Sequence, residues 1–102
     1  MPGNSPLVKG QPLGGLVRRI VADVLVVPVE DVQPGKALMR DLGAESIDFM
    51  DLVFRLEDEL GTRIPFTRWQ RFVEAKLADS DPVAAITPEF VQAFAEEELG
   101  RL

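Results

Sequence analysis

The stretch from Arg40 to Phe49, RDLGAESIDF, places one serine, Ser46, between acidic residues where a loop is expected to become a helix. Serine is a preferred helix N-cap, so we expect Ser46 to cap this helix. Its hydroxyl could also serve as a covalent handle. The backbone N–H groups of a first helical turn favour negative charge, so a phosphoryl group attached to Ser46 would be stabilised there.

The rest of the chain excludes self-activation of this serine. The stretch GAESID lacks the closing glycine of the reactive-serine motif G-x-S-x-G. The chain has no His and no Cys, which excludes a Ser-His-Asp triad, a thiolate nucleophile, disulfides and Cys/His metal sites. We therefore expect no catalytic residues and no metal, and a modification of Ser46 would require another enzyme.

Composition and charge restrict the class of protein. A chain of 102 residues with 46% hydrophobic residues predicts one compact domain. The net charge of −6 and the pI near 4.5 argue against binding nucleic acid or an anionic membrane surface, and they suit partners with basic patches. No apolar run is long enough for a membrane span, and the N-terminus lacks the apolar block of a signal peptide. We expect a cytoplasmic monomer.

The first third of the chain predicts a tail followed by a helix. Proline and glycine are frequent in residues 1–12, which predicts a flexible tail or linker, and residues 13–102 are expected to form the domain. Apolar residues at spacings of three and four predict a helix from Leu13 to about Leu25, stopped by Pro28.

A long loop and a second helix follow. The loop over residues 30–44 has apolar residues that could anchor it on the core, and loops of this length are often functional. These anchors are Val32, Leu38, Met39 and Leu42. The next helix is predicted over about Ile47–Leu60, with Ser46 as N-cap and Gly61 as its stop.

The last third predicts further helices. A capping box of Thr67 and Gln70 predicts a helix that begins after Thr67 and runs to about Ala78. A short turn or helix is expected over 81–86, and Thr87, followed by proline, opens a last helix. Strand signals are nearly absent, so we predict an all-α bundle of four to five helices.

The helix after Ser46 has two apolar faces when its residues are placed at 100° intervals. The face expected to meet the core contains Phe49, Leu52, Val53, Leu56 and Leu60. The second patch, roughly opposite, contains Ile47, Met50 and Phe54. Five acids and one base over residues 46–60 give a net charge of −4. Either the helix is sandwiched between two layers, or the second patch is an apolar docking strip with an acidic rim.

The segment from Asp41 to Pro65, DLGAESIDFMDLVFRLEDELGTRIP, resembles the phosphopantetheine attachment segment of acyl carrier proteins. That family typically carries D-L-G-x-D-S-L, an acidic amphipathic helix and an I-P ending. The resemblance implies that Ser46 receives a 4′-phosphopantetheine arm from coenzyme A, installed by a phosphopantetheinyl transferase. It also implies that the arm carries fatty-acyl or polyketide intermediates as thioesters.

The same resemblance implies a docking surface for acyltransferase, ketosynthase and other synthase enzymes with basic patches. Its residues would be Ile47, Asp48, Met50, Asp51, Phe54, Glu57 and Asp58. The chain departs from the family pattern at Glu45, where aspartate is usual, and at Phe49, which is bulkier than is common there. Two alternatives stay open at this point: a peptidyl or aminoacyl carrier, and an unmodified helical interaction module.

Overall fold

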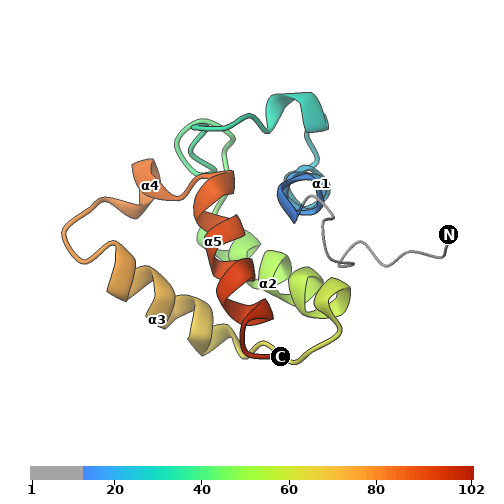
Figure 1. The fold of residues 1–102 in the computed structure, drawn as a ribbon. Helices are drawn as coiled ribbons and strands as arrows, with labels where there is room; N and C mark the ends of the chain where they lie inside the picture. The colour runs from blue at the N-terminus through green and yellow to red at the C-terminus, as the bar shows by residue number, and fades with distance from the viewer. Residues whose placement is uncertain (1–12) are drawn as a thin grey trace, which may run out of the picture.

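The computed structural model describes residues 13–102, and every regular element within them is a helix (Figure 1). In chain order these are α1 (Leu13–Leu25), the short 3₁₀ helix η1 (Val29–Asp31), α2 (Ser46–Leu60), α3 (Phe66–Lys76), α4 (Pro82–Ala85) and α5 (Pro88–Leu99). The predicted all-α bundle is confirmed. The tail predicted over residues 1–12 lies outside the described part of the chain. None of the helices in residues 13–102 is long and apolar enough to cross a bilayer.

Helices α1, α2 and α5 form the body of the bundle, because α1 packs against both of the others. Of the predicted apolar stripe of α1, four residues are buried and three are half-buried: Leu16, Val17, Ile20 and Val21, and Leu13, Val24 and Leu25. Helices α3 and α4 lie on the side of α5 away from α1, joined by a loop at their outer end (Figure 1). Residues of α3 and α4 line one cavity together with the start of α2.

A cluster of aromatic rings attaches α3 to the bundle. The Trp69 ring stacks on Phe49 of α2 with 5.6 Å between centroids, and it meets the edge of Phe94 of α5 at 5.2 Å. Phe72 meets Phe90 and Phe94 at 5.1 and 5.3 Å. Such offset and edge-to-face pairs add to the stabilisation from burial alone.

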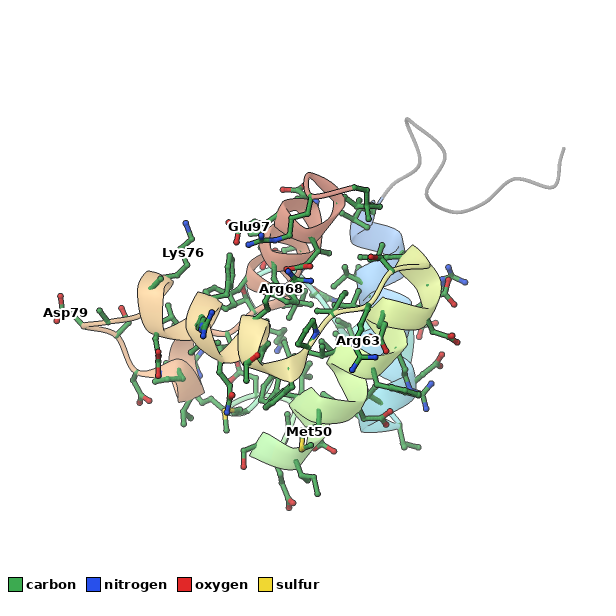
Figure 2. All side chains as sticks on the ribbon, turned by 90° about the horizontal axis from the view of Figure 1, so that it is seen from below. Met50, Arg63, Arg68, Lys76, Asp79 and Glu97 are labelled. Carbon is green, nitrogen blue, oxygen red and sulfur yellow. The ribbon has the colours of Figure 1, made fainter. Side chains whose placement is uncertain are left out.

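A buried carboxylate also connects α3 with α5. Glu98 is only 2% exposed, and its Oε2 lies 3.3 Å from Arg68 Nε and 3.4 Å from Arg101 Nε. Figure 2 shows Arg68 between α3 and α5. Burying a carboxylate is costly unless a cation accompanies it, so the two guanidinium groups explain how Glu98 is accommodated.

Two helix starts differ from the sequence prediction. Ser46 is not the N-cap of α2, because Glu45 occupies that position with extended backbone and its N–H donates to Asp48 Oδ2 at 2.8 Å. Thr67 does not cap α3 either. Pro65 precedes the helix with a φ of −59°, and its carbonyl already accepts the Arg68 N–H, so the helix begins one residue before Thr67.

The predicted end of α2 and the predicted starts of α4 and α5 are confirmed, whereas α3 ends at Lys76, two residues before the predicted Ala78. Gly61 ends α2 with a φ of 68°, a left-handed conformation that glycine adopts without steric cost. Asp81 caps α4, accepting the Val83 N–H at 3.1 Å. Thr87 caps α5, and its hydroxyl accepts the Phe90 N–H at 3.2 Å.

Val26, directly after α1, has a φ of 55° and a side chain that is 87% exposed. A β-branched residue is strained in this region, and glycine is not. We expect Val26→Gly to raise the free energy of unfolding by about 1 kcal/mol, because strain is removed and little burial is lost. Urea denaturation at neutral pH checks this, and an unchanged or lower stability would contradict it.

Candidate functional site

Hydrogen bonds hold the long loop before Ser46 in place near both of its ends. Arg18 of α1 donates from Nε to the Val32 carbonyl at 2.7 Å and from Nη2 to the Val29 carbonyl at 3.0 Å. Farther along, the Leu38 N–H donates to the Ile86 carbonyl at 2.8 Å. The predicted anchors are confirmed, because Val32 and Leu38 are fully buried and Met39 and Leu42 are half-buried. These contacts hold the loop against α1 and the segment after α4.

The last turn of this loop is closed by Asp41. Its Oδ2 accepts the Ala37 N–H at 2.8 Å and pairs with Arg40 Nη2 at 3.0 Å. The hydrogen bond from Arg40 and the one from the Ala37 N–H lower the pKa of the Asp41 carboxyl from 3.8 to about 2. The Ala44 N–H also donates to the Leu38 carbonyl at 2.8 Å, two residues before Ser46.

The pKa of Asp41 predicts a pH dependence of stability. A carboxyl whose pKa is depressed in the folded state stabilises the fold above its unfolded pKa, and this contribution is lost as the pH falls toward about 2. In Asp41→Asn the free energy of unfolding should therefore decline less steeply between about pH 5 and about pH 2 than in the wild type. Urea denaturation across this range checks it, with Asp79→Asn in the α3–α4 loop as the matched control. Equal slopes in Asp41→Asn and the wild type would contradict the assignment.

Ser46 is the first residue of α2, and its side chain is exposed. The predicted core face of α2 is buried as expected: Phe49, Leu52, Val53, Leu56 and Leu60. The second patch is exposed, with exposed fractions of 67% for Ile47, 54% for Met50 and 67% for Phe54. Within residues 13–102, therefore, no second layer covers this patch of α2.

The acidic residues of α2 divide into two groups. Asp51 and Asp58 are exposed, and Asp51 pairs with Arg55 one turn later at 3.2 Å. Asp48 accepts the Glu45 N–H, and Glu57 Oε2 accepts the Ile64 N–H at 2.7 Å. All four acids were expected to serve docking, and the bonds of Asp48 and Glu57 to the backbone were not predicted.

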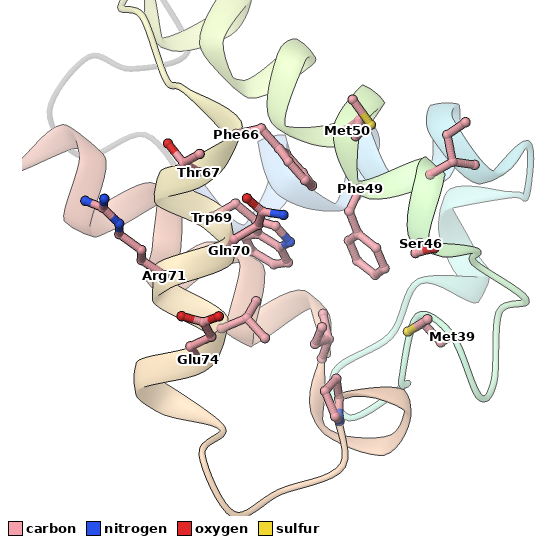
Figure 3. Close-up of a pocket in the computed structure, with 14 residues that line it drawn as sticks. Met39, Ser46, Phe49, Met50, Phe66, Thr67, Trp69, Gln70, Arg71 and Glu74 are labelled. Carbon is pink, nitrogen blue, oxygen red and sulfur yellow. The ribbon is translucent and has the colours of Figure 1, made fainter.

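A cavity of about 860 Å³ opens beside Ser46 (Figure 3). Ser46, Phe49 and Met50 line it from α2, and α3 forms the facing wall. Ile47 also lines it, and the remaining apolar lining residues, none of which was predicted as a site residue, are Met39, Phe66, Trp69, Val73, Pro82 and Ile86. Their apolar character was visible in the sequence, but they belong to three segments that only the fold brings together.

The sequence of the chain is similar to those of known carrier proteins. Residues 15–69, more than half of the chain, match the family described as "Phosphopantetheine attachment site". The acyl carrier protein AcpXL of Mesorhizobium japonicum is 32% identical over 65 residues, which cover 64% of this chain and 70% of that protein. AcpXL of Rhizobium meliloti is 33% identical over 66 residues, with 64% and 70% covered.

A third relative is the acyl carrier protein of Nitratidesulfovibrio vulgaris (strain DP4), 35% identical over 60 residues, which cover 59% of this chain and 79% of the relative. The residues that match the family model, 15–69, include Ser46 and the residues on both sides of it. The chain belongs to the acyl carrier protein family, whose members are non-catalytic carriers with a covalently attached 4′-phosphopantetheine.

Proposed function

We propose that Ser46 is the attachment site and that the chain carries fatty-acyl or polyketide intermediates between enzymes. The observation that carries this proposal is the position of Ser46, exposed at the start of α2 and at the mouth of a largely apolar cavity. The arm supplies a terminal thiol, the group that this cysteine-free chain lacks, and the thiol holds an acyl group as a thioester.

The residues around Ser46 fit a phosphodiester-linked arm. The exposed hydroxyl can be reached by a partner enzyme, and the N-terminus of a 15-residue helix favours the negative charge of the phosphate. The negative charges of Glu45 and Asp48 partly offset this attraction of the helix N-terminus for phosphate, although the Asp48 carboxylate accepts the Glu45 N–H. We expect the phosphate to stay near solvent, where both effects are screened.

The attachment reaction belongs to a phosphopantetheinyl transferase. A bond forms between Ser46 Oγ and the β-phosphorus of coenzyme A as the pyrophosphate bond breaks. Adenosine 3′,5′-bisphosphate leaves, and the serine proton passes to the transferase or to solvent. We place this reaction in the cytoplasm, where coenzyme A is available.

The proposal is tested by incubating the chain with coenzyme A and a broad-specificity phosphopantetheinyl transferase and measuring the intact mass. The expected result is a gain of one phosphopantetheine group. An unchanged mass, under conditions in which a known carrier is modified, would reject the carrier function. The remaining interpretation would then be a helical interaction module that carries no modification.

We also propose that the exposed strip of α2 docks partner enzymes, including the transferase, acyltransferases and ketosynthases. It combines the apolar patch of Ile47, Met50 and Phe54 with the exposed carboxylates Asp51 and Asp58, while Asp48 and Glu57 add negative charge nearby. An apolar centre with a charged rim suits weak docking on a basic surface, which permits exchange among partners.

Charge reversal on the strip provides a quantitative check. Asp51→Lys and Asp58→Lys should each raise the Kd for the transferase by roughly threefold to tenfold at low salt, because attraction becomes repulsion. The control is Asp23→Lys on α1, an exposed site with the same change in net charge. Titration calorimetry at two salt concentrations measures the effect. If Asp23→Lys weakens binding as much as Asp51→Lys and Asp58→Lys do, the net charge of the protein and not the strip determines the affinity.

A further inference from the structure

Met50 lies in the middle of the apolar patch on α2. Ile47 precedes it by three residues and Phe54 follows it by four, so the three side chains are neighbours along one edge of the helix. Met50 is 54% exposed, and the other two side chains are each 67% exposed. Figure 2 shows Met50 on α2, near the lower margin of the molecule. A partner that covers this patch therefore also covers the thioether of Met50.

The thioether is the group in this patch that oxidises most readily. The chain has no Cys, so methionine supplies all the sulfur of the polypeptide. Of the two methionines within residues 13–102, Met50 is exposed, whereas Met39 is half-buried and packs against the core. A dissolved oxidant therefore reaches the Met50 sulfur more easily than the Met39 sulfur. When an arm on Ser46 is loaded, its thiol is held in the thioester and does not compete for the oxidant.

The charge of α2 selects the class of oxidant. Residues 46–60 carry five acids and one base, a net charge of −4, and Asp51 directly follows Met50. This negative field repels anionic oxidants such as hypochlorite, and it does not repel a neutral peroxide. The surroundings of Met50 therefore favour oxidation by hydrogen peroxide or an uncharged organic peroxide.

We propose that Met50 is a site of reversible oxidation by a peroxide, and that the oxidised carrier binds its partner enzymes weakly. The inference rests on the proposed docking strip, of which Met50 is the apolar centre. The Met50 sulfur attacks one oxygen of hydrogen peroxide, the O–O bond breaks, and the products are methionine sulfoxide and water. The sulfur loses two electrons and the peroxide gains them, so the reaction needs no other reactant.

The added oxygen changes the apolar centre of the strip into a polar one. The sulfoxide oxygen binds water, and docking against an apolar surface removes this water without supplying a hydrogen-bond donor in its place. Because Met50 is exposed, the sulfoxide should leave the bundle folded. Cargo on an oxidised carrier is then withheld from partner enzymes until a methionine sulfoxide reductase restores the thioether.

Tryptic cleavage places the three methionines on separate peptides, so the oxidation of each can be followed by mass. Met39 is on residues 37–40, Met50 on residues 41–55 and Met1 on residues 1–9. The chain without an arm is treated with limiting hydrogen peroxide. The peptide of residues 41–55 should gain one oxygen several times faster than the peptide of residues 37–40. Equal rates, or faster oxidation of Met39, would overturn the assignment of Met50 as the site.

Titration calorimetry with the transferase, after the peroxide has been removed, measures the effect on docking. Oxidation of the wild type should raise the Kd by roughly tenfold, and reductases for both sulfoxide epimers should restore it. Each variant is compared with itself before and after peroxide. The Kd of Met50→Leu, which has an apolar side chain of similar size without sulfur, should not change, whereas the Kd of Met39→Leu should rise as in the wild type.

Two outcomes of the calorimetry would overturn the inference. One is an unchanged Kd in wild-type protein whose Met50 is fully oxidised and whose circular dichroism shows an intact fold. The other is an equal rise of the Kd in Met50→Leu, which would assign the effect to a different residue. If the untreated chain instead fails to gain a phosphopantetheine group from coenzyme A, the proposed function itself is rejected.

Discussion

Ser46→Ala is expected to abolish the gain of one phosphopantetheine group completely when the chain is incubated with coenzyme A and a transferase. The substitution removes the one oxygen at the start of α2 that can form the phosphodiester bond. Intact-mass spectrometry measures the outcome. Ser80→Ala, which removes another exposed serine in the α3–α4 loop, should leave the gain unchanged.

The absence of modification in Ser46→Ala should not arise from unfolding of the variant. Ser46 is exposed and is not the N-cap of α2, so its removal should change the free energy of unfolding by no more than about 0.5 kcal/mol. Circular dichroism and urea denaturation check this. A folded Ser46→Ala protein that still gains the full mass would show that the arm is attached to a different residue.

Phe49→Ala is expected to lower the free energy of unfolding by about 3 to 5 kcal/mol, a large part of the stability of a small domain. The Phe49 ring is 5% exposed and stacks on Trp69, so its removal leaves a cavity between α2 and α3. Phe54→Ala is the matched control on the same helix. Its ring is 67% exposed, and we expect a change within about 0.5 kcal/mol.

Urea denaturation of the two variants distinguishes the two faces of α2. A similar loss of stability in both would mean that Phe54 is buried in solution and that the exposed strip does not exist. A small loss in both would mean that the aromatic cluster contributes little. Because Phe54→Ala should fold normally, it can also be used to measure docking without an effect on stability.

The two faces of α2 could be predicted from the sequence because side-chain direction along a helix follows from local geometry. Periodicity alone separates Phe49 and Leu56 from Ile47 and Phe54, but it left open whether the second patch is covered, and the structure shows Ile47 and Phe54 exposed. The position of Ser46 at the start of the helix was predicted to within one residue. The prediction that Ser46 is the N-cap was wrong, because Glu45 takes that position and its N–H donates to the Asp48 carboxylate. With several polar and acidic residues near a helix start, the sequence does not decide which of them is the N-cap.

The cavity beside Ser46 could not be predicted, because its walls depend on contacts between residues far apart in the chain. The bond from the Leu38 N–H to the Ile86 carbonyl joins the loop to the α4 segment, and Glu98 joins α5 to Arg68 of α3. Neither contact has a local signature in the sequence. Glu57 has no such signature either: its bond to the Ile64 N–H holds the connection into α3, whereas the resemblance to acyl carrier proteins implied a role in docking.

Attachment at Ser46 is tested most directly by locating the arm in the wild-type protein after modification. Tryptic cleavage after Arg40 and Arg55 releases residues 41–55, DLGAESIDFMDLVFR, in which Ser46 is the only hydroxyl side chain. Tandem mass spectrometry should find the mass of phosphopantetheine on this peptide and on no other. A modification found on a different peptide, or an unmodified 41–55 peptide while a control carrier is fully converted, would contradict the account.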